Sequence, residues 1–304
     1  MADEAPLEVA GVKITHPSRV LFPATAESAE HTKGDAARHY EAVAEHLLPH
    51  LVDRPLSVVR CPGGIDDCFY QKHHTGSLPE TVDSVTLEER DGQADYLVVK
   101  DLEGLLSLVQ YGALEFHPWS CRTDRLERPD RLIFDLDPGP GVGWQGVKSA
   151  ARRVRDRLEE LGLTSFLRTT GGEGLHVVTP LERRSSWQEL KDFARALAED
   201  LVQEDPEHLV ATAAKEKREG KLFLDWLRTG RGATAVVNYS LRARPGATVA
   251  TPLRWNELDG LESAAAYTLE SIPRRLAALD EDPWEGFFDL RQSITAKMQR
   301  EVGV

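Results

Sequence analysis

Apolar residues recur every three to four positions in two stretches of the chain, residues 35–51 and residues 147–161. This spacing puts them on one face of a helix, so both stretches are predicted to be amphipathic helices. The tail from about residue 269 is also predicted to be helical. Two further helix starts follow from residues that cap helices well: Asp101, before a helix running toward Glu115, and Ser185 or Ser186, before a helix reaching about Val202.

Short apolar runs bounded by turn residues predict strands. They span residues 56–60, 68–72, 96–100, 131–137, 165–169, 175–179, 222–226 and 234–237. Glycine-rich turns at 62–64 and 171–172 separate neighbouring runs, which indicates hairpins. The mixture of strand pairs and helices predicts an α+β fold with largely antiparallel sheets. A doubly wound fold is disfavoured, because the strand ending at Asp137 is not followed by a phosphate loop and helix of the usual form.

Asp135 and Asp137 are candidate catalytic residues at the end of a predicted strand. Side chains alternate along a strand, so the two carboxylates share one face while Phe134 and Leu136 occupy the other. Two carboxylates this close repel each other unless a cation joins them. A pair of Mg²⁺ or Mn²⁺ ions would remove the repulsion and promote phosphoryl transfer. The alternative is that Asp137 opens a turn at Pro138-Gly139 and Asp135 is solvated on a sheet edge.

Asp225 is a third candidate, because it lies in the strongly apolar predicted strand at residues 222–226. A carboxylate in such a strand needs a partner. A metal ion is one candidate partner. A buried salt bridge with Arg228 or Arg231 is the other, and the strand pattern does not choose between them.

The segment Thr169-Thr170-Gly171-Gly172-Glu173-Gly174-Leu175-His176 is a candidate phosphate site. A glycine-rich turn exposes backbone N–H groups that can hold phosphate oxygens, and His176 would emerge on the strand that follows. An ordinary hairpin turn with a core histidine is the alternative. Farther along, Arg242 and Arg244 share a predicted loop, and arginine forks match phosphate oxygens. A solvated charged loop would explain these arginines equally.

The net charge of −13 argues against diffuse attraction to nucleic acid. A polyanion can still bind where basic residues share one face, and the acidic residues here crowd toward residues 257–285. The 304 residues suit one large domain or two tightly joined ones. No run of eighteen apolar residues predicts a membrane span, and no secretory signal is recognised. Three cysteines, an odd and low number, predict reduced cytosolic thiols rather than a disulfide framework.

With these motifs in order, residues from about 14 to 302 resemble the polymerase domain of bacterial DNA ligase D, in the archaeo-eukaryotic primase superfamily. The matching segments are THPSRVLFPAT, RPLSVVRCPGGIDDCFYQKH, ALEFHPW, RLIFDLDPG, TTGGEGLHVVTPL, GKLFLDW and NYSLRARPGATVATPLRW. The resemblance implies a single primase-polymerase catalytic domain over residues 1–304, with two largely antiparallel sheets flanked by helices around a central catalytic cleft. The part at about 1–125 would bind the DNA end and its 5′-phosphate. The part at about 126–304 would be catalytic and RRM-like.

The same resemblance implies addition of NTPs or dNTPs to a primer 3′-hydroxyl, at gaps or double-strand-break ends, in nonhomologous end joining. Two Mn²⁺ or Mg²⁺ ions would be the cofactors. The catalytic and metal-binding residues would be Asp135, Asp137 and Asp225. Nucleotide contacts would fall on His117, Thr170, Gly171, His176 and Arg242. Arg19 and Lys33 would recognise a downstream 5′-phosphate, Phe69 and Tyr70 would stack on a template base, and Arg60 and Lys72 would add positive charge.

The expected partners are gapped DNA or DNA ends with a 5′-phosphate, together with Ku and a DNA ligase, in the bacterial cytosol at the nucleoid and without any membrane. Two residues depart from the family pattern: Glu173 stands where a lysine is common, and Arg19 replaces a common lysine. Three other functions stay open at this point. They are a non-catalytic module that binds and synapses DNA ends, a gap-filling primase-polymerase of another repair pathway, and a metal-dependent phosphodiesterase.

Overall fold

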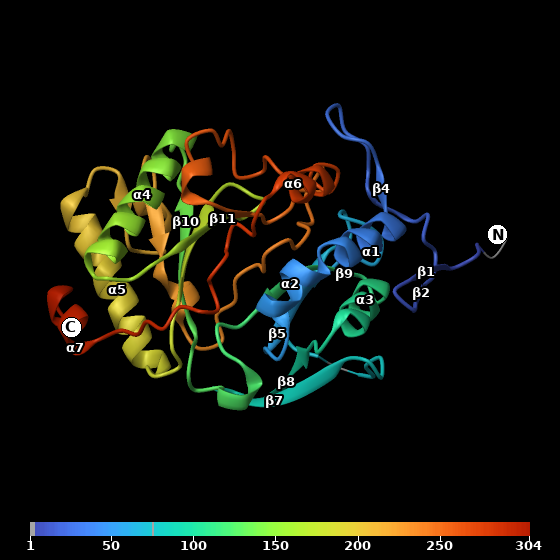
Figure 1. Cartoon of the computed structure of the whole chain (residues 1–304), viewed down its shortest axis with the longest axis horizontal. Coiled ribbons are helices and arrows are strands. Elements are labelled where there is room, and N and C mark those ends of the chain that lie inside the picture. The colour runs from blue at the N-terminus through green and yellow to red at the C-terminus, as the bar shows by residue number, and fades with distance from the viewer. Residues whose placement is uncertain (1–3, 75) are drawn as a thin grey trace. The chain divides into compact units, whose positions relative to one another are not determined.

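The computed structural model describes residues 4–74 and 76–304, and the chain divides into two compact units (Figure 1). The first unit comprises Met1–Pro118, Val236–Thr251 and Tyr267–Asp280. The second unit comprises Trp119–Ala235, Pro252–Ala266 and Glu281–Val304. Each unit therefore combines segments that are far apart in the sequence.

The first unit is built on a five-stranded sheet with the order β6-β5-β8-β7, in which β9 also pairs with β5. All of its strand pairs are antiparallel. These strands are β5 (Leu56–Arg60), β6 (Phe69–Gln71), β7 (Asp83–Glu89), β8 (Gly92–Val98) and β9 (Ala113–Pro118). Two small antiparallel pairs precede them: β1 (Leu7–Val9) with β2 (Val12–Ile14), and β3 (Val20–Phe22) with β4 (His31–Thr32). The helices are α1 (Lys33–Ala42), α2 (Ala44–Leu51), α3 (Leu102–Gln110) and α6 (Ile272–Ala278).

One core joins the helices and the sheet of the first unit, and it includes Tyr40, Leu47 and Phe116, none of which is exposed. Two helix boundaries differ from those predicted. The helix predicted over 35–51 is two helices, because Val43 has φ −98° and ψ 2° and ends α1. The helix predicted from Asp101 to Glu115 begins as expected, with the Asp101 carboxylate accepting from the Gly104 N–H, but it ends at Gln110.

The second unit is built on a six-stranded sheet with the order β13-β14-β10-β12-β11-β15. Only β13 and β14 pair in parallel among the described strands of this sheet. The strands are β10 (Arg131–Pro138), β11 (Phe166–Thr169), β12 (Leu175–Pro180), β13 (Leu209–Val210), β14 (Leu222–Asp225) and β15 (Pro252–Leu253). Helices α4 (Trp144–Glu160) and α5 (Trp187–Glu204) pack against this sheet (Figure 1). Shorter helices are α7 (Ala296–Glu301) and the 3₁₀ turns Thr123–Arg125, Lys215–Lys217, Trp226–Thr229 and Trp255–Glu257.

The predicted α+β class with largely antiparallel sheets is confirmed, while two local predictions are wrong. Residues 234–237 form no strand: Thr234 makes one isolated bridge with Trp119, and Val237 donates to the Phe116 carbonyl. Their apolar character reflects burial of a connecting segment, not pairing in a sheet. The tail is not continuously helical either, because residues 279–295 separate α6 from α7. No helix in residues 4–74 and 76–304 is long and apolar enough to cross a membrane.

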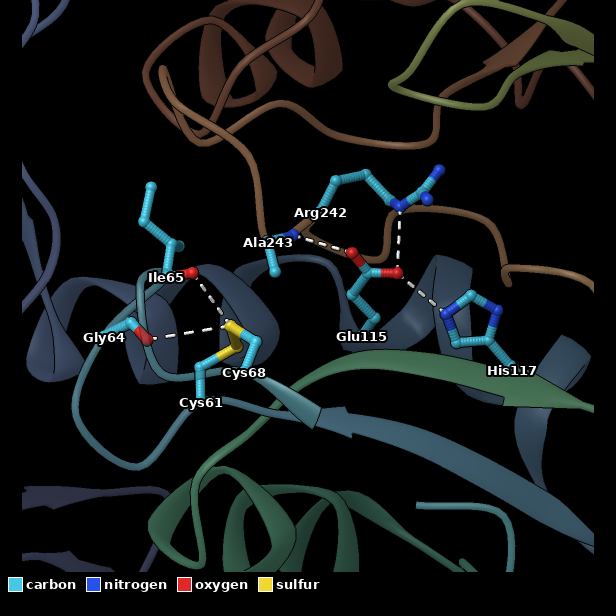
Figure 2. The surroundings of a disulfide bond; sticks show 8 residues. All are labelled: Cys61, Gly64, Ile65, Cys68, Glu115, His117, Arg242 and Ala243. Atoms are coloured by element: carbon cyan, nitrogen blue, oxygen red, sulfur yellow. Dashed lines mark hydrogen bonds and ion pairs between the residues drawn. A yellow bond between two sulfur atoms is a disulfide. The ribbon is translucent and has the colours of Figure 1, made fainter. Parts of the chain in front are cut away.

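The prediction of three reduced cysteines is also wrong. Cys61 and Cys68 form a disulfide with their Cα atoms 4.2 Å apart (Figure 2). Cys121 is buried and takes no part in a disulfide. The turn at Pro62-Gly63-Gly64 reverses the chain after β5 and so brings Cys68 back to Cys61. A count of cysteines contains no information about this local proximity.

Candidate active site

Three carboxylates converge on one face of the β10–β14 pair. Asp135 lies directly opposite Asp225, and Asp137 lies opposite Phe223 two positions farther along. Directly opposed residues share a face of the sheet, and so do residues two apart on one strand. The side chains of Asp135 and Asp225 are 17% and 11% exposed, and that of Asp137 is 50% exposed. The sheet register therefore gathers the three predicted catalytic aspartates.

Two arginines neutralise these carboxylates. The Arg228 guanidinium lies 3.2 Å from Asp135 and 3.1 Å from Asp225, and Arg218 lies 2.7 Å from Asp137. Burial raises the pKa of Asp137, and repulsion from Asp135 raises it further. Burial also raises the pKa of Asp225, against the opposing charge of Arg228. Carboxylates whose charge is disfavoured in this way attract cations to the same face.

His176 contacts this cluster from β12, where it lies opposite Asp135. Its Nε2 is 3.4 Å from the Asp135 carboxylate, and its Nδ1 accepts a hydrogen bond from the Arg168 Nε at 3.0 Å. Burial lowers the pKa of His176 to about 4, against the charge of Asp135, so the ring is neutral at pH 7. The hydrogen bond from Arg168 leaves the ring proton on Nε2, facing Asp135. The sequence did not single out Arg168 as a partner of His176. An arginine within the apolar strand β11 could have indicated such a partner, because a buried charge needs a polar contact.

The β11–β12 turn is held tightly against β10. The Thr170 hydroxyl donates to the Gly174 carbonyl at 2.9 Å and accepts from the N–H groups of Gly172 and Gly174. Gly171 has a positive φ of 67°. A Cβ at Gly174 would lie 2.2 Å from the Leu136 carbonyl oxygen, so only glycine allows this approach. Thr170 and Gly171 thus shape a turn beside the carboxylates, as the glycine-rich pattern predicted.

In the first unit, Glu115 organises the two other predicted nucleotide contacts (Figure 2). One of its carboxylate oxygens lies 2.8 Å from His117 Nε2 and 3.0 Å from Arg242 Nε, and the other accepts from the Ala243 N–H at 2.7 Å. The Glu115 side chain is only 7% exposed. Burial alone would raise its pKa, but the hydrogen bond from His117 and the charge of Arg242 lower it to about 2. The sequence did not single out Glu115, which contacts both of these predicted side chains.

Lys33 and Arg19 line one small cavity of about 60 Å³ in the first unit. Lys33 Nζ donates to the Thr15 carbonyl at 3.1 Å and to Gln110 Oε1 at 2.7 Å, and Arg19 Nη1 donates to the Pro62 carbonyl at 2.7 Å. No carboxylate among the described residues forms an ion pair with either cation. Burial lowers the pKa of Lys33 to about 8, and repulsion from Arg19 lowers it further. The two cations that line this cavity are thus held by neutral acceptors, and the 5′-phosphate contact predicted for them stays a prediction.

The other four predicted DNA contacts lie on or beside β5 and β6. Phe69 and Tyr70 are 46% and 51% exposed, and the Tyr70 ring lies edge-on to the His117 ring at a centroid distance of 6.0 Å. Arg60 lies over the Tyr111 ring at 3.9 Å and donates to the Tyr111 carbonyl. Lys72 forms an ion pair with Glu89 at 2.7 Å, so it contributes less positive charge than predicted.

The comparisons with known proteins decide the family. A family model described as the LigD primase-polymerase domain matches residues 32–284. The chain belongs to the LigD primase-polymerase domain family. It is 40% identical to the multifunctional non-homologous end joining protein LigD of Pseudomonas aeruginosa, over 97% of this chain and 35% of that protein. It is 36% identical to the corresponding DNA repair protein of Mycobacterium tuberculosis, over 82% of this chain and 33% of that protein. The chain therefore spans about a third of the length of these LigD relatives.

A solved structure agrees with this family. The polymerase domain of Mycobacterium tuberculosis ligase D, in complex with DNA, matches with a TM-score of 0.83 and 33% identity. The match covers 92% of this chain and 99% of that one. LigD primase-polymerase domains are nucleotidyltransferases, and the LigD relatives act in nonhomologous end joining. The predicted family and enzyme class are confirmed.

LigD polymerase domains depend on divalent metal ions in general. Within the described part of the chain, no group of three or more His, Cys, Asp or Glu side chains is arranged to hold a metal ion. The donor chemistry nevertheless fits, because Mg²⁺ and Mn²⁺ prefer carboxylate oxygens and three carboxylates share one face here. Asp135, Asp137 and Asp225 would hold the ions in exchange for their ion pairs with Arg228 and Arg218.

Proposed function

We propose that this chain adds nucleotides to a primer 3′-hydroxyl at gaps or broken ends of DNA, through the Asp135, Asp137 and Asp225 cluster. The observation that supports this most is the register that sets Asp135 opposite Asp225, with Asp137 on the same face. An end-binding module has no need for three repelling carboxylates. Bound divalent ions would supply the positive charge that activates the 3′-hydroxyl and neutralises the triphosphate.

The remaining roles follow from the chemistry of each side chain. The neutral His176 ring donates from Nε2 and so orients the Asp135 carboxylate. In the first unit, Glu115 holds the Arg242 guanidinium and the His117 ring in place, and we assign phosphate contacts to both. Guanidinium forks bind phosphate oxygens in a fixed geometry, which favours transfer of a nucleotide over hydrolysis of a diester.

A labelled primer annealed across a gap, with NTPs or dNTPs and Mn²⁺ or Mg²⁺, tests this function. Longer primers are expected. Retention of DNA without extension would instead support a module that only binds ends, and shortened primers would support a phosphodiesterase. Comparing ribonucleotides with deoxynucleotides, and the two ions with each other, defines the preferred substrate and cofactor.

We further propose that the DNA substrate carries a downstream 5′-phosphate bound by Lys33 and Arg19, with Phe69 or Tyr70 stacked on an unpaired template base. An acidic protein gains little from diffuse attraction to DNA and needs a localised anion site. Stacking of one base on an aromatic ring contributes about 1–3 kcal/mol. Ku and a DNA ligase are the partners that nonhomologous end joining would supply. The protein would then act in the bacterial cytosol at the nucleoid.

The preference for a 5′-phosphate over a 5′-hydroxyl is expected to weaken as the pH rises through 8. The pKa of Lys33 is lowered to about 8, so the free protein binds phosphate with a full charge below that pH and loses the proton above it. At pH 9 the preference should be several-fold smaller than at pH 7. The test is the binding of gapped DNA that carries either a 5′-phosphate or a 5′-hydroxyl, measured by fluorescence anisotropy at both pH values.

The matched control is Lys33→Arg, whose guanidinium stays protonated across this range. Its preference for the 5′-phosphate is expected to be the same at pH 7 and pH 9. If the wild-type preference for the 5′-phosphate is also the same at pH 7 and pH 9, Lys33 does not bind the phosphate. An unchanged preference in Lys33→Ala would lead to the same conclusion.

Glu173→Lys is expected to tighten nucleotide binding. Glu173 is exposed on the β11–β12 turn, where the family commonly has a lysine, and it adds negative charge beside the proposed triphosphate site. Reversing one exposed charge should lower the nucleotide KM about fivefold. Glu204→Lys, an exposed position at the end of α5, makes the same change in charge and should leave the KM unchanged. An unaltered KM in Glu173→Lys would show that Glu173 points away from the nucleotide.

A further inference from the structure

The second unit contains an arginine-rich cavity that the proposed active site does not use. Its volume is about 390 Å³, and it is lined by the end of β12, the segment around Thr123–Arg125 and the segment before α7. Five arginines line it: Arg122, Arg125, Arg183, Arg184 and Arg291. Only two acidic residues, Asp130 and Glu182, share its lining.

The positive charge of this cavity is only partly neutralised. Arg183 forms an ion pair with Asp124 at 2.6 Å, and Arg184 forms one with Glu182 at 3.0 Å. Arg122 forms a longer one with Asp130 at 4.0 Å. Within the residues that the structure describes, no carboxylate forms an ion pair with Arg125 or Arg291. Positive charge gathered in a concave surface attracts polyanions locally, even in a chain with a net charge of −13.

An exposed aromatic ring lies at the same cavity. Phe288 is 45% exposed and packs edge-on against the buried Phe287 at a centroid distance of 5.1 Å. Arg291 Nη1 donates to the Phe288 carbonyl at 3.0 Å, so a guanidinium lies beside the backbone of Phe288. Proteins bind single-stranded nucleic acid with basic side chains that contact the phosphates and aromatic rings that stack on the bases.

The cavity lies at the opposite end of the sheet from the aspartate cluster. Asp130, which lines it, directly precedes β10, and Pro180 ends β12 there, whereas Asp137 lies near the other end of β10. Five residues of strand separate Asp130 from Asp135 and seven separate it from Asp137, or about 16 Å and about 23 Å. The arginines therefore cannot contact a phosphate held by the aspartate cluster.

We propose that this cavity binds a single-stranded segment of nucleic acid, with phosphates on the arginines and a base on Phe288. A free anion alone would need neither the exposed ring nor a cavity of nucleotide size. The inference rests on the proposed function in one respect: the single strand would be the overhang of a broken DNA end. The binding itself requires no nucleotidyl transfer.

The test is binding of a fluorescent oligothymidylate with a 5′-hydroxyl, measured by anisotropy without nucleotide or divalent ions. The 5′-hydroxyl avoids the Lys33 and Arg19 cavity. The double variant Arg125→Glu with Arg184→Glu is expected to weaken affinity at least tenfold. It should also reduce the slope of log affinity against log salt by about 1.4, since each lost phosphate contact on a single strand removes about 0.7.

The matched control reverses two exposed cations elsewhere in the second unit, Arg195→Glu on α5 and Lys297→Glu on α7. It makes the same change in net charge and should retain most of the affinity. Phe288→Ala should weaken binding, and Phe288→Tyr should restore it. Melting temperatures of all variants identify any that fail to fold.

Equal losses in the double variant and its control would overturn the inference, as would displacement of the oligothymidylate by oligoglutamate at equal charge. Full affinity in Phe288→Ala would overturn the single-strand assignment. Primer extension is a separate readout. A chain that extends no primer but shows the arginine-dependent binding would overturn the proposed function alone, and the reverse result would overturn this inference alone.

Discussion

Asp225→Asn is expected to abolish primer extension while leaving the protein folded. Removing one carboxylate from a two-metal site costs several kcal/mol of transition-state stabilisation, so extension should fall about a thousandfold or more. The fold should tolerate the change, because burial raises the pKa of Asp225 and the native structure therefore disfavours its charge. Arg228 keeps its ion pair with Asp135. Extension rates in Mn²⁺ and the melting temperature provide the two measurements.

Asp156→Asn on α4 is the matched control, since its side chain is 56% exposed and lies in the same unit. Its extension rate should equal that of the wild type. Near-normal extension by Asp225→Asn in Mn²⁺ would exclude Asp225 from the catalytic cluster. A large fall in the melting temperature would instead show that its ion pair with Arg228 is structural.

Glu115→Gln is expected to lower the free energy of unfolding by about 3 kcal/mol, because it removes the negative charge from a largely buried ion pair with Arg242. It should also raise the nucleotide KM, since Arg242 and His117 lose the group that orients them. Denaturant unfolding at pH 7 and nucleotide KM at a temperature where the variant is folded are the measurements. Glu103→Gln, an exposed position on α3 of the same unit, is the control and should change neither.

The pH dependence gives a sharper form of this prediction. The pKa of Glu115 is lowered to about 2 in the folded protein, against about 4.3 in an unfolded chain. Its stabilisation is therefore complete above about pH 5 and is lost as the pH falls toward 2. The difference in stability between wild type and Glu115→Gln should narrow from pH 7 to pH 4. A constant difference would mean that the Glu115 charge contributes nothing to the fold.

Local patterns predicted the parts of the site that lie within single elements. The spacing of Asp135 and Asp137 was enough to put both on one face of a strand, because side chains alternate along any strand. The glycine-rich segment at Gly171 predicted a tight turn for an equally local reason. For Asp225 the sequence left open a metal ion or a salt bridge, and the structure shows an ion pair with Arg228 while the role in metal binding stays a prediction.

The ends of helices and strands, and the pairing of distant segments and cysteines, were harder to predict, for physical reasons that differ from case to case. The apolar run at 234–237 is buried without pairing, and apolar character alone does not distinguish these two states. Gly112, with a positive φ of 94°, follows the end of α3, yet an apolar run continues beyond it into β9. The Cys61–Cys68 disulfide depends on how the turn after β5 folds back.

The sequence by itself determined the fold class and the family, because these depend on short-range periodicity and on the order of motifs along the chain. It also singled out the three aspartates, whose catalytic role stays a prediction. Only the tertiary structure decided which distant side chains meet. The register of β10 with β14 and β12 brings Asp225 and His176 to Asp135, and the return of Val236–Thr251 to the first unit brings Arg242 to Glu115. The contact between Glu115 and Ala243, for example, joins residues 128 positions apart, and no local pattern specifies it.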